Sequence, residues 1–519
     1  MGSFARHVEA LASAGLRAVA LGLVVSVGAI GFAHIGHASA RPSRPQPAAI
    51  RHAVDISVGR AVHGRAIPTG FLGLSIEYWA VEAYAGKDPR AINPALVQLL
   101  RNLAPGQATV LRIGGVSTDK TWWPTPRIGR PPGVNYSLTP RRLAVIKALA
   151  QAVDARLTMG VNLEADSPAL AAAEARAMLT GIGRRRLAAL ELGNEPELYG
   201  NQDFGWYVHD GRGVTGRPPT YDMVAFTHDF SRIGGDLPAV PLAGPASGGQ
   251  RWLGQLADFT AAEPRLGQVT VHRYPMQACY NTPGSPSYPT IGRLLSPVAS
   301  RSLADGVAGY LSVAHRGHLP FRIDEMNTIS CGNPPGVPNT FAMALWALDA
   351  LFADAQVGVD GVNMHTYPNA VYQLFKFKHS GSSWQAFVEP EYYGLLMFSQ
   401  AAPPGARLLS ASGGSDAVRV WATRDTRKSI RVVLINDDTS RSHLVAVRVA
   451  GARGGATIER LQAPSAHATD GVTLGGQSFG PATDTGLLSG PQHASAVAAA
   501  AGRYVVRLPA AGAALLTLR

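Results

Sequence analysis

The sequence is poor in cysteine and lacks the common cofactor and metal motifs. Only Cys279 and Cys331 occur among its 519 residues, so at most one disulfide can form. No glycine fingerprint follows the first predicted strand, which leaves a dinucleotide site without support. The scattered histidines, including His272 and His365, lack the spacing of metal ligands, and we assign these two a supporting role. We therefore expect no cofactor and no metal.

Acidic residues are outnumbered, and the formal net charge is +12. A basic protein suggests an anionic partner such as an acidic polysaccharide, nucleic acid or a membrane surface. The basic residues are dispersed, with 184–186 the one tight cluster, and no basic stripe with interleaved aromatics is present. Nucleic acid is therefore disfavoured. The alternative is a compositional bias with no partner at all.

The first 40 residues have the pattern of a signal peptide. Arg6 and Arg17 precede an apolar run over 18–33, and 38–40 fits a small-residue cleavage site. The run is short for a bilayer span of roughly 20 residues. We expect an exported protein, periplasmic or extracellular, with no stable membrane insertion after processing and a Pro-rich spacer over 41–52. The alternative is an uncleaved membrane anchor.

Apolar segments of two kinds alternate between Phe71 and Tyr367, and this pattern predicts a (β/α)8 TIM barrel over 67–370. A doubly wound open sheet is the other possibility. Helical periodicity occurs between the predicted strands, over 94–102, 139–154, 169–181, 221–234, 252–262, 300–314 and 339–357, with Thr139 as an N-cap. The predicted strands are Phe71–Trp79, Ala108–Gly115, Leu157–Leu163, Leu187–Asn194, Pro241–Pro245, Val269–Tyr274, Phe321–Asn327 and Gly361–Tyr367.

After Tyr367 the pattern changes to short β-type runs between Gly, Pro, Ser and Asp clusters. This texture predicts a β-sandwich domain over 371–519. The segment 53–66 also reads as a strand and can pair into the same sandwich, which would then be built from both chain ends. Residues 464–500 are expected to form long loops. The predicted sandwich strands are 416–423, 429–436, 443–449, 457–461, 504–508 and 513–518.

Two acidic segments, 190–196 and 321–327, end predicted barrel strands at the glutamates Glu195 and Glu325. Hydrolysis of a glycosidic bond requires two such carboxyl groups, one proton donor and one nucleophile or base. Side chains alternate along a strand, so we expect the neighbours Asp324 and Glu325 to face opposite ways. Glu191 shares a face with Glu195 but lies deeper in the barrel, so we expect it to pack in the core or to bond the residues around the site. Capping or surface salt bridges are the alternative for both catalytic candidates.

Three motifs together resemble a known enzyme family. The segments 111–119 (LRIGGVSTD), 191–196 (ELGNEP) and 324–327 (DEMN) are similar to glycoside hydrolase family 79, among the clan A retaining glycosidases. That family contains β-glucuronidases and heparanases. The resemblance implies a double displacement on β-linked glucuronic acid, with Glu195 as the general acid/base and Glu325 as the nucleophile. The implied partner is a glucuronic-acid-containing glycoside, oligosaccharide or polysaccharide.

The resemblance also implies substrate contacts. Asn194 would bond the sugar 2-OH, and Glu77 and Asp119 other hydroxyls, although Asp119 could instead cap a turn. Tyr274 would hold Glu325 ionised and oriented, a core tyrosine being the alternative. Tyr367 would contact the uronic acid carboxylate.

Backbone amides around Gly332 and Asn333 would contact the same carboxylate, and no arginine clamp is apparent. Cys279 and Cys331 follow the sixth and seventh strands, so a disulfide between them would fix this loop; two separate buried thiols are the alternative. Trp122, Trp123 and Trp206 could stack on sugar rings or form a loop core.

The rival functions are another clan A activity on a neutral sugar, such as an arabinofuranosidase, and a carbohydrate-binding protein without catalysis. Heparanases of the family lose an insert after the second strand. The corresponding segment 120–137 is short and Pro-rich here, so we expect no excision.

Overall fold

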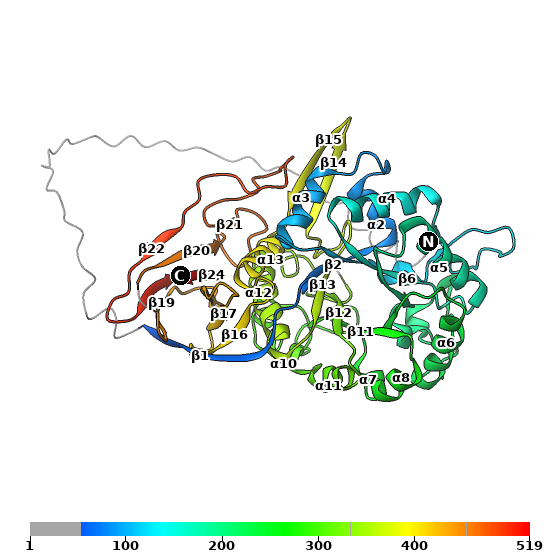
Figure 1. Cartoon of the computed structure of the whole chain (residues 1–519), viewed down its shortest axis with the longest axis horizontal. Coiled ribbons are helices and arrows are strands. Elements are labelled where there is room, and N and C mark those ends of the chain that lie inside the picture. Colours follow the sequence, from blue (N-terminus) through cyan, green and yellow to red (C-terminus); the bar gives the residue numbers. More distant parts are fainter. Residues whose placement is uncertain (1–52, 333, 453, 519) are drawn as a thin grey trace, which may run out of the picture.

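The computed structural model describes residues 53–332, 334–452 and 454–518. The predicted signal peptide and spacer therefore lie outside the described residues. No helix in the described part is long and apolar enough to cross a membrane. Figure 1 shows a barrel of strands and helices beside a second domain made of strands.

Eight parallel strands close into the predicted barrel, in the order β10-β11-β12-β13-β2-β3-β6-β7. Each begins within three residues of its predicted start, because buried strands of a parallel sheet are continuous apolar runs that are easily recognised. The strands are β2 (Leu72–Glu77), β3 (Val110–Gly114), β6 (Arg156–Val161), β7 (Leu187–Leu192), β10 (Leu242–Ser247), β11 (Leu266–Arg273), β12 (Phe321–Met326) and β13 (Gly361–Thr366).

Most of the predicted helices begin at side-chain caps. Thr139 accepts a hydrogen bond from the Arg142 N–H, and Pro140 occupies the first helical position of α4. Asn93, Ser167 and Asp222 cap α3, α5 and α6 in the same way. The helices as predicted are α3 (Pro94–Leu103), α4 (Pro140–Ala152), α5 (Pro168–Ile182), α6 (Met223–Gly235) and α12 (Phe341–Val357).

Two predicted helices are each divided. The segment 252–262 forms α7 (Gln250–Leu253) and α8 (Leu256–Ala262), and 300–314 forms α10 (Arg301–Asp305) and α11 (Ala308–Arg316). Gly254 and Gly306 are the C-caps of the first helix in each pair. Glycine disfavours a helix interior because it has the most backbone freedom to lose. Three α-helices of the described part were not predicted: α2 (Tyr78–Ala85), α9 (Ile291–Leu294) and α13 (Pro390–Ala401).

The second domain is a curled, mostly antiparallel sheet to which both chain ends contribute, as predicted. β1 (Val54–Ala66) pairs antiparallel with β16 and parallel with β19. The path of the sheet is β21-β20-β24-β18-β17-β16-β1-β19-β23, with β22 paired to β20. The other strands are β16 (Arg407–Gly413), β17 (Val418–Arg424), β18 (Ile430–Asn436), β19 (His443–Val449), β20 (Ala456–Gln462), β21 (Thr473–Leu474), β22 (Ser495–Val497), β23 (Tyr504–Leu508) and β24 (Gly512–Leu518).

Alternate side chains of this sheet serve two cores. Val432 and Leu434 lie in the core of the sandwich, whereas Val433 and Ile435 belong to the large core shared with the barrel. At the junction, the Trp421 ring stacks on Phe352 of α12, and its Nε1 donates to Asp349 Oδ1 at 2.7 Å. The sandwich therefore packs directly against helix α12 of the barrel.

The segment that follows the barrel packs against the barrel and also contacts the C-terminal domain, where the Tyr393 hydroxyl accepts from the Phe479 N–H. It forms a hairpin, β14 (Phe375–Ser380) and β15 (Ser383–Val388), and then α13 (Pro390–Ala401). The Tyr392 hydroxyl donates to the Leu99 carbonyl of α3 at 2.6 Å. The strands of the C-terminal sheet start only at β16, some 36 residues after the domain boundary that we drew at 370.

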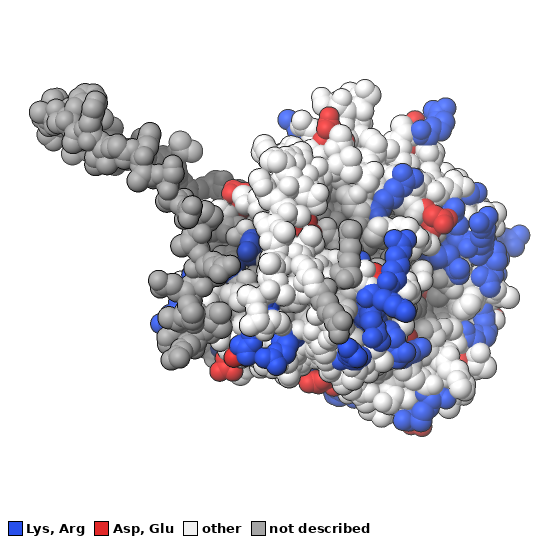
Figure 2. All heavy atoms as spheres, turned by 60° about the vertical axis from the view of Figure 1, so that its left-hand side comes forward, with Lys and Arg blue, Asp and Glu red and all other residues white. Residues whose placement is uncertain are grey.

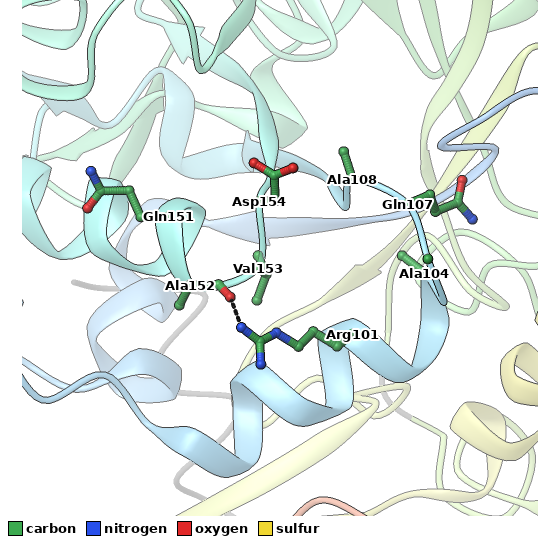
Figure 3. Close-up of a pocket in the computed structure, with 9 residues that line it drawn as sticks. Arg101, Ala104, Gln107, Ala108, Gln151, Ala152, Val153 and Asp154 are labelled. Atoms are coloured by element: carbon green, nitrogen blue, oxygen red, sulfur yellow. Dashed lines mark hydrogen bonds between the residues drawn. The ribbon is translucent and has the colours of Figure 1, made fainter.

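A hollow of about 520 Å³ lies at the opposite end of the barrel from the predicted catalytic residues (Figure 3). Arg101, Gln107, Gln151 and Asp154 line it, in the connections that lead into β3 and β6. Active sites of this fold form at the C-terminal ends of the strands. This hollow is therefore not the candidate active site.

Candidate active site

Glu195 follows β7 in a left-handed backbone conformation, with φ 48° and ψ 55°. This conformation disfavours a non-glycine residue by about 1–3 kcal/mol and is typical of functional positions. Its N–H donates to the Ala246 carbonyl at 2.9 Å, and its own carbonyl accepts from the Leu198 N–H. A Cβ at Gly248 would lie 2.5 Å from Glu195 Oε1, so a larger residue where the loop after β10 passes the carboxylate would displace that carboxylate.

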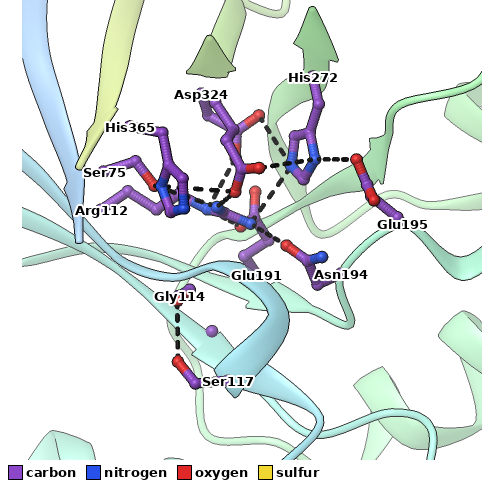
Figure 4. A network of polar contacts seen from close by, with 12 residues as sticks. Ser75, Arg112, Gly114, Ser117, Glu191, Asn194, Glu195, His272, Asp324 and His365 are labelled. Atoms are coloured by element: carbon purple, nitrogen blue, oxygen red, sulfur yellow. Dashed lines mark hydrogen bonds and ion pairs between the residues drawn. The ribbon is translucent and has the colours of Figure 1, made fainter. Parts of the chain in front are cut away.

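Glu195 and Glu325 lie close together at the C-terminal ends of β7 and β12, and Figure 4 shows Glu195 beside His272. One carboxylate oxygen of each, together with a ring nitrogen of His272, lie within 4.8 Å of one another. His272 Nδ1 is 3.0 Å from Glu195 Oε1 and 3.8 Å from Glu325 Oε1. The side chain of Glu195 is 22% exposed and that of Glu325 8%. The fold therefore brings together two glutamates that lie 130 residues apart in sequence.

Glu325 is surrounded by groups that favour its charged form. Arg112 Nη1 donates to Oε2 at 2.6 Å, and the Tyr274 hydroxyl donates to Oε1 at 2.8 Å. His365 Nδ1 lies 3.7 Å from Oε2. Burial raises the pKa of Glu325, but the two histidines, Arg112 and Tyr274 together hold it far below its ordinary value. An ionised carboxylate is what a nucleophile requires.

His272 is fully buried between the two catalytic candidates. Burial and the Arg112 charge lower the pKa of His272, but the carboxyl groups of Glu325, Glu195 and Asp324 outweigh them and raise it to about 9. The histidine is therefore a cation at neutral pH, and its Nδ1–H donates to Glu195. His272, predicted only as a supporting residue, contacts the acid/base candidate directly.

Arg112 lies at the centre of the site and was not predicted as a site residue. Its guanidinium, with no exposed surface, donates to Glu191 Oε2 at 2.6 Å, to Glu325 Oε2 and to Asn194 Oδ1 at 2.9 Å. Its Nη2 also lies 3.3 Å from His272 Nε2. The signal was present: an arginine within the apolar strand β3 must be paired with carboxylates to be buried. Glu191, which we expected to lie deeper in the barrel and to bond other side chains, is one of these carboxylate partners.

The side chains of Asp324 and Glu325 do not alternate across β12, so the expectation that they face opposite ways is wrong. Asp324 Oδ2 lies 3.1 Å from Arg112 Nε, and Glu325 contacts the same guanidinium, so both consecutive carboxyl groups point into the barrel. The pairing of β12 with β11 shifts register here: Val271 faces Ile323, and His272 faces Glu325. A β-bulge of this kind leaves one residue unpaired and redirects its side chain.

Asn194 and Asp119 occupy different positions relative to the cavity. The Asn194 side-chain oxygen accepts from Arg112, which leaves its NH₂ group to donate elsewhere. Asp119 is only 3% exposed, and four protein donors surround its carboxylate: the N–H groups of Leu163, Glu164 and Asn194, and the Tyr199 hydroxyl. These bonds use its ordinary acceptor capacity. The carboxylate of Asp119 therefore bonds the loops after β6 and β7 and not the following turn that was the alternative, and its contact with a sugar stays a prediction.

Glu77 and Tyr367 stand on the opposite side of the mouth from Glu195. Glu77 accepts hydrogen bonds from the N–H groups of Val116 and Ser117, and its Oε1 lies 3.5 Å from His365 Nε2. Tyr367 packs between the rings of Trp79, His365 and Tyr372. Their roles toward a sugar stay predictions.

The loop after β12 is tied to the loop after β11. Cys279 and Cys331 form the predicted disulfide, with their Cα atoms 5.7 Å apart. Gly332 follows with φ 82°, and a Cβ there would meet the Ala278 Cβ at 2.6 Å. Asn333 lies outside the described residues. The disulfide therefore fixes the segment in which we expect the carboxylate-binding amides.

Trp122, Trp123 and Trp206 are packed in the loops, which was the alternative to stacking on sugar rings. Trp122 and Trp206 are each 8% exposed and form a small core with Val134 and Leu170. Trp206 Nε1 donates to the Asp119 carbonyl at 2.7 Å. Trp123 is partly buried against the main core. In this structure they support the loops around the mouth.

Glu197, two residues after the acid/base candidate, is a further buried carboxyl group. Its Oε1 accepts from the Gly249 N–H, and its Oε2 has no partner among the described residues. Burial and the charge of Glu195 raise the pKa of Glu197 to about 7. Glu197 was not predicted as a site residue. It follows a strand end in a polar loop, and only the tertiary fold shields its carboxyl group from solvent.

Among the described residues, Glu195, His272 and Glu325 form the group whose ligand atoms come close enough to hold a metal ion. Arg112 and Tyr274, however, already donate to the Glu325 oxygens. A cation would have to compete with the guanidinium for the same carboxylate, so the donor set does not favour a metal.

The comparisons with known proteins agree with this geometry. Residues 420–515 match the family model of the glycosyl hydrolase family 79 C-terminal beta domain. A 4-O-α-L-rhamnosyl-β-D-glucuronidase from Fusarium oxysporum 12S, solved with Rha-GlcA, has a similar structure with a TM-score of 0.69 and 20% identity, over 89% of this chain and 100% of that chain. No curated protein matches the sequence.

The barrel is shared more widely. A family 51 arabinofuranosidase from Xanthomonas axonopodis pv. citri has a TM-score of 0.64 and 15% identity, over 90% of this chain and 100% of that chain. A family 30 xylanase from Clostridium acetobutylicum has a TM-score of 0.53 and 14% identity, over 89% and 99%. At these identities the likeness concerns the fold. The predicted resemblance is confirmed: in its C-terminal beta domain the chain is similar to glycoside hydrolase family 79.

Proposed function

We propose that this protein is a retaining glycosidase that releases β-linked glucuronic acid. The observation that carries the proposal is the approach of one Glu195 oxygen to one Glu325 oxygen, within 4.8 Å. Retaining glycosidases hold their two carboxyl groups about 5–5.5 Å apart, whereas inverting enzymes need about 6.5–9.5 Å to admit a water. The short separation supports double displacement.

In the first step, Glu325 attacks the anomeric carbon of the bound sugar. Glu195 gives its proton to the glycosidic oxygen, so the leaving group departs as an alcohol and a glycosyl ester on Glu325 remains. In the second step, Glu195 takes a proton from a water, which attacks the same carbon and releases Glu325. The NH₂ group of Asn194 donates to the sugar 2-OH, a bond that strengthens in the transition state.

The preference for a uronic acid has its own support. The Fusarium oxysporum enzyme with a similar fold is named for its action on a β-D-glucuronide. Basic side chains outnumber acidic ones on the face of the molecule in Figure 2, in line with the net charge of +12. We place the sugar carboxylate against the Tyr367 hydroxyl and the amides around Gly332, in keeping with recognition by neutral donors.

A panel of aryl glycosides tests the activity. We expect turnover of aryl β-glucuronide, with at least tenfold lower kcat/KM for the β-glucoside and for the α-L-arabinofuranoside. Proton NMR of the first product should show the β-anomer, and Glu325→Gln should abolish turnover while retaining ligand binding. A first product with the α-anomer would exclude the retaining mechanism.

Two outcomes of the same panel favour the rival functions. Faster turnover of the arabinofuranoside than of the glucuronide would assign the barrel to a family 51-like activity. A folded wild-type protein that turns over none of the glycosides, but binds glucuronides, would be a carbohydrate-binding protein.

We further propose that the protein acts outside the cytoplasm after removal of residues 1–40. The basis is the charged start, the apolar run and the cleavage site of that segment. N-terminal sequencing of the protein recovered from the medium or periplasm should begin near Arg41. Recovery of the intact chain in the membrane fraction would support the uncleaved anchor.

A further inference from the structure

Two fully buried carboxyl groups lie beside the nucleophile candidate. Glu191, Asp324 and Glu325 all contact the guanidinium of Arg112, and Figure 4 shows Glu191 and Asp324 on either side of it. Glu191 and Asp324 are both 0% exposed. Bulk solvent therefore does not reach these two side chains.

The hydrogen bonds of this cluster do not balance if every carboxyl group is ionised. Arg112 Nε carries a single hydrogen, which it donates to Glu191 Oε2 at 2.6 Å, while Asp324 Oδ2 is 3.1 Å from the same nitrogen. Glu191 Oε1 and both oxygens of Asp324 are buried with no hydrogen-bond partner among the described residues. An ionised carboxylate left without donors in the interior is costly by several kcal/mol.

A proton within the cluster would supply the missing donor, because a protonated carboxyl group both donates and accepts. The cations nearest Asp324, Arg112 and the buried His272, are both shared with Glu325. The His272 Nε2 lies 3.9 Å from Asp324 Oδ1, too far for a hydrogen bond.

We propose that Asp324 is a neutral carboxylic acid in the working enzyme and donates its proton to the free oxygen of Glu191. Asp324, Glu191 and Arg112 then form a chain that ends on Glu325. The bulge in β12, which turns Asp324 inward beside Glu325, is what builds this chain. Asp324 is a positioning residue: it acts through Glu191 and Arg112, which hold the nucleophile.

The proton belongs on Asp324 and not on Glu191, because Glu191 takes the short bond from Arg112 while both Asp324 oxygens have none. The electrostatics agree. Burial and the neighbouring Glu191 raise the pKa of Asp324 well above its ordinary value, against the charges of Arg112 and His272. Burial also raises the pKa of Glu191, but Arg112 outweighs it and holds that pKa below the ordinary value.

The infrared difference spectrum between the wild type and Asp324→Asn at neutral pH tests the proposal. The C=O stretch of a protonated carboxyl group is separate from the bands of a carboxylate, and we expect the wild type to show it and the variant to lose it. The matched control is Glu174→Gln, at another fully buried carboxyl group, far along the chain in α5; it should leave the Asp324 band in place. Loss of carboxylate bands alone in Asp324→Asn would overturn the proposal.

A second variant keeps the test decisive if Asp324→Asn does not fold. In Glu191→Gln the acceptor is no longer charged, so Asp324 should ionise against Arg112 and the protonated band should disappear there as well. Persistence of that band in Glu191→Gln would contradict the proposal.

Kinetics give an independent readout, which rests on the proposed glycosidase function. The amide of Asn can donate to Glu191 as the acid does, so Asp324→Asn should keep kcat/KM within about threefold, whereas Asp324→Leu should lower kcat at least tenfold. Equal losses in the two variants would contradict the donor role. A protein with no glycosidase activity would defeat the proposed function but leave the infrared test intact.

Discussion

Arg112 Nη1 and Glu325 Oε2 are 2.6 Å apart, and the guanidinium side chain has no exposed surface. This one contact links the second strand of the barrel to the seventh and sets the charge state of the nucleophile candidate. The arginine therefore holds the candidate nucleophile and does not only fill the barrel core. A short, charge-assisted hydrogen bond of this kind is roughly twice as strong as a neutral one.

Arg112→Lys should separate the effect of the positive charge on Glu325 from the effect of the several hydrogen bonds that the guanidinium donates. A lysine keeps one positive charge but loses the planar fork that bonds several partners at once. We expect kcat to fall by about 10²-fold or more, and the acidic limb of the kcat/KM profile to move to higher pH, because Arg112 is one of the groups that depress the Glu325 pKa. The check is a pH–rate profile on aryl β-glucuronide. An unchanged acidic limb would remove Arg112 from the control of that carboxylate.

Tyr274→Phe removes only the side-chain hydroxyl that donates a hydrogen bond to the nucleophile candidate. The donated bond at 2.8 Å both orients Glu325 and lowers its pKa. We expect a drop in kcat of about 10-fold to 100-fold and a change of about 1 kcal/mol in unfolding free energy, the size of one hydrogen bond. Kinetics and urea unfolding measure the two effects. A large loss of stability with unchanged kcat would favour the core-tyrosine alternative.

Glu195→Ala tests the acid/base assignment through the leaving group. General acid catalysis contributes typically 10²–10⁴-fold, and its loss matters most for a leaving group that needs a proton. We expect a steep fall on alkyl glucuronides and a small one on dinitrophenyl glucuronide. Sodium azide should restore turnover and give a β-glycosyl azide, because the small anion can use the space that the carboxylate leaves. An α-azide, or no rescue, would argue against Glu195 as acid/base.

The barrel could be predicted from sequence because each buried strand is an apolar run that ends at a polar or glycine residue. β12 (Phe321–Met326) and β13 (Gly361–Thr366) start at their predicted residues. Helix α13 and the hairpin before it were missed as barrel partners. Their contacts, such as Tyr392 to Leu99, join residues 293 positions apart, and no local pattern encodes that pairing.

The site was predictable in its two glutamates and less so in its electrostatics. Glu195 and Glu325 stand out because each interrupts an apolar strand end. The inward turn of Asp324 depends on a register shift between β11 and β12, which alternation within one strand cannot reveal. Asp119 looked like a sugar ligand in its motif, and only the loops after β6 and β7 show that its oxygens are already engaged.

Glu197→Gln should change the pH dependence of stability. The folded-state pKa of Glu197 is about 7, above the value of a free glutamate, so the native state holds a proton that the unfolded chain releases near pH 4–5. Stability must therefore fall as pH rises from about 4.5 to 7. The glutamine variant lacks this loss, and its melting temperature should exceed that of the wild type by a few degrees at pH 8 but not at pH 4. Equal shifts at both pH values would contradict the assignment.

Replacing both cysteines tests whether the disulfide organises the substrate loop. Cys279 and Cys331 close a loop with a sequence separation of 52 residues, and removal of a disulfide typically costs about 2–4 kcal/mol. We expect Cys279→Ser/Cys331→Ser to melt at a lower temperature and to show a raised KM for aryl β-glucuronide, because the Gly332 segment loses its anchor to the loop after β11. The KM for a neutral aryl β-glucoside, which has no carboxylate to place, should change less. Equal KM increases for the two substrates would mean that the disulfide supports the barrel mouth as a whole and does not hold a carboxylate-binding loop.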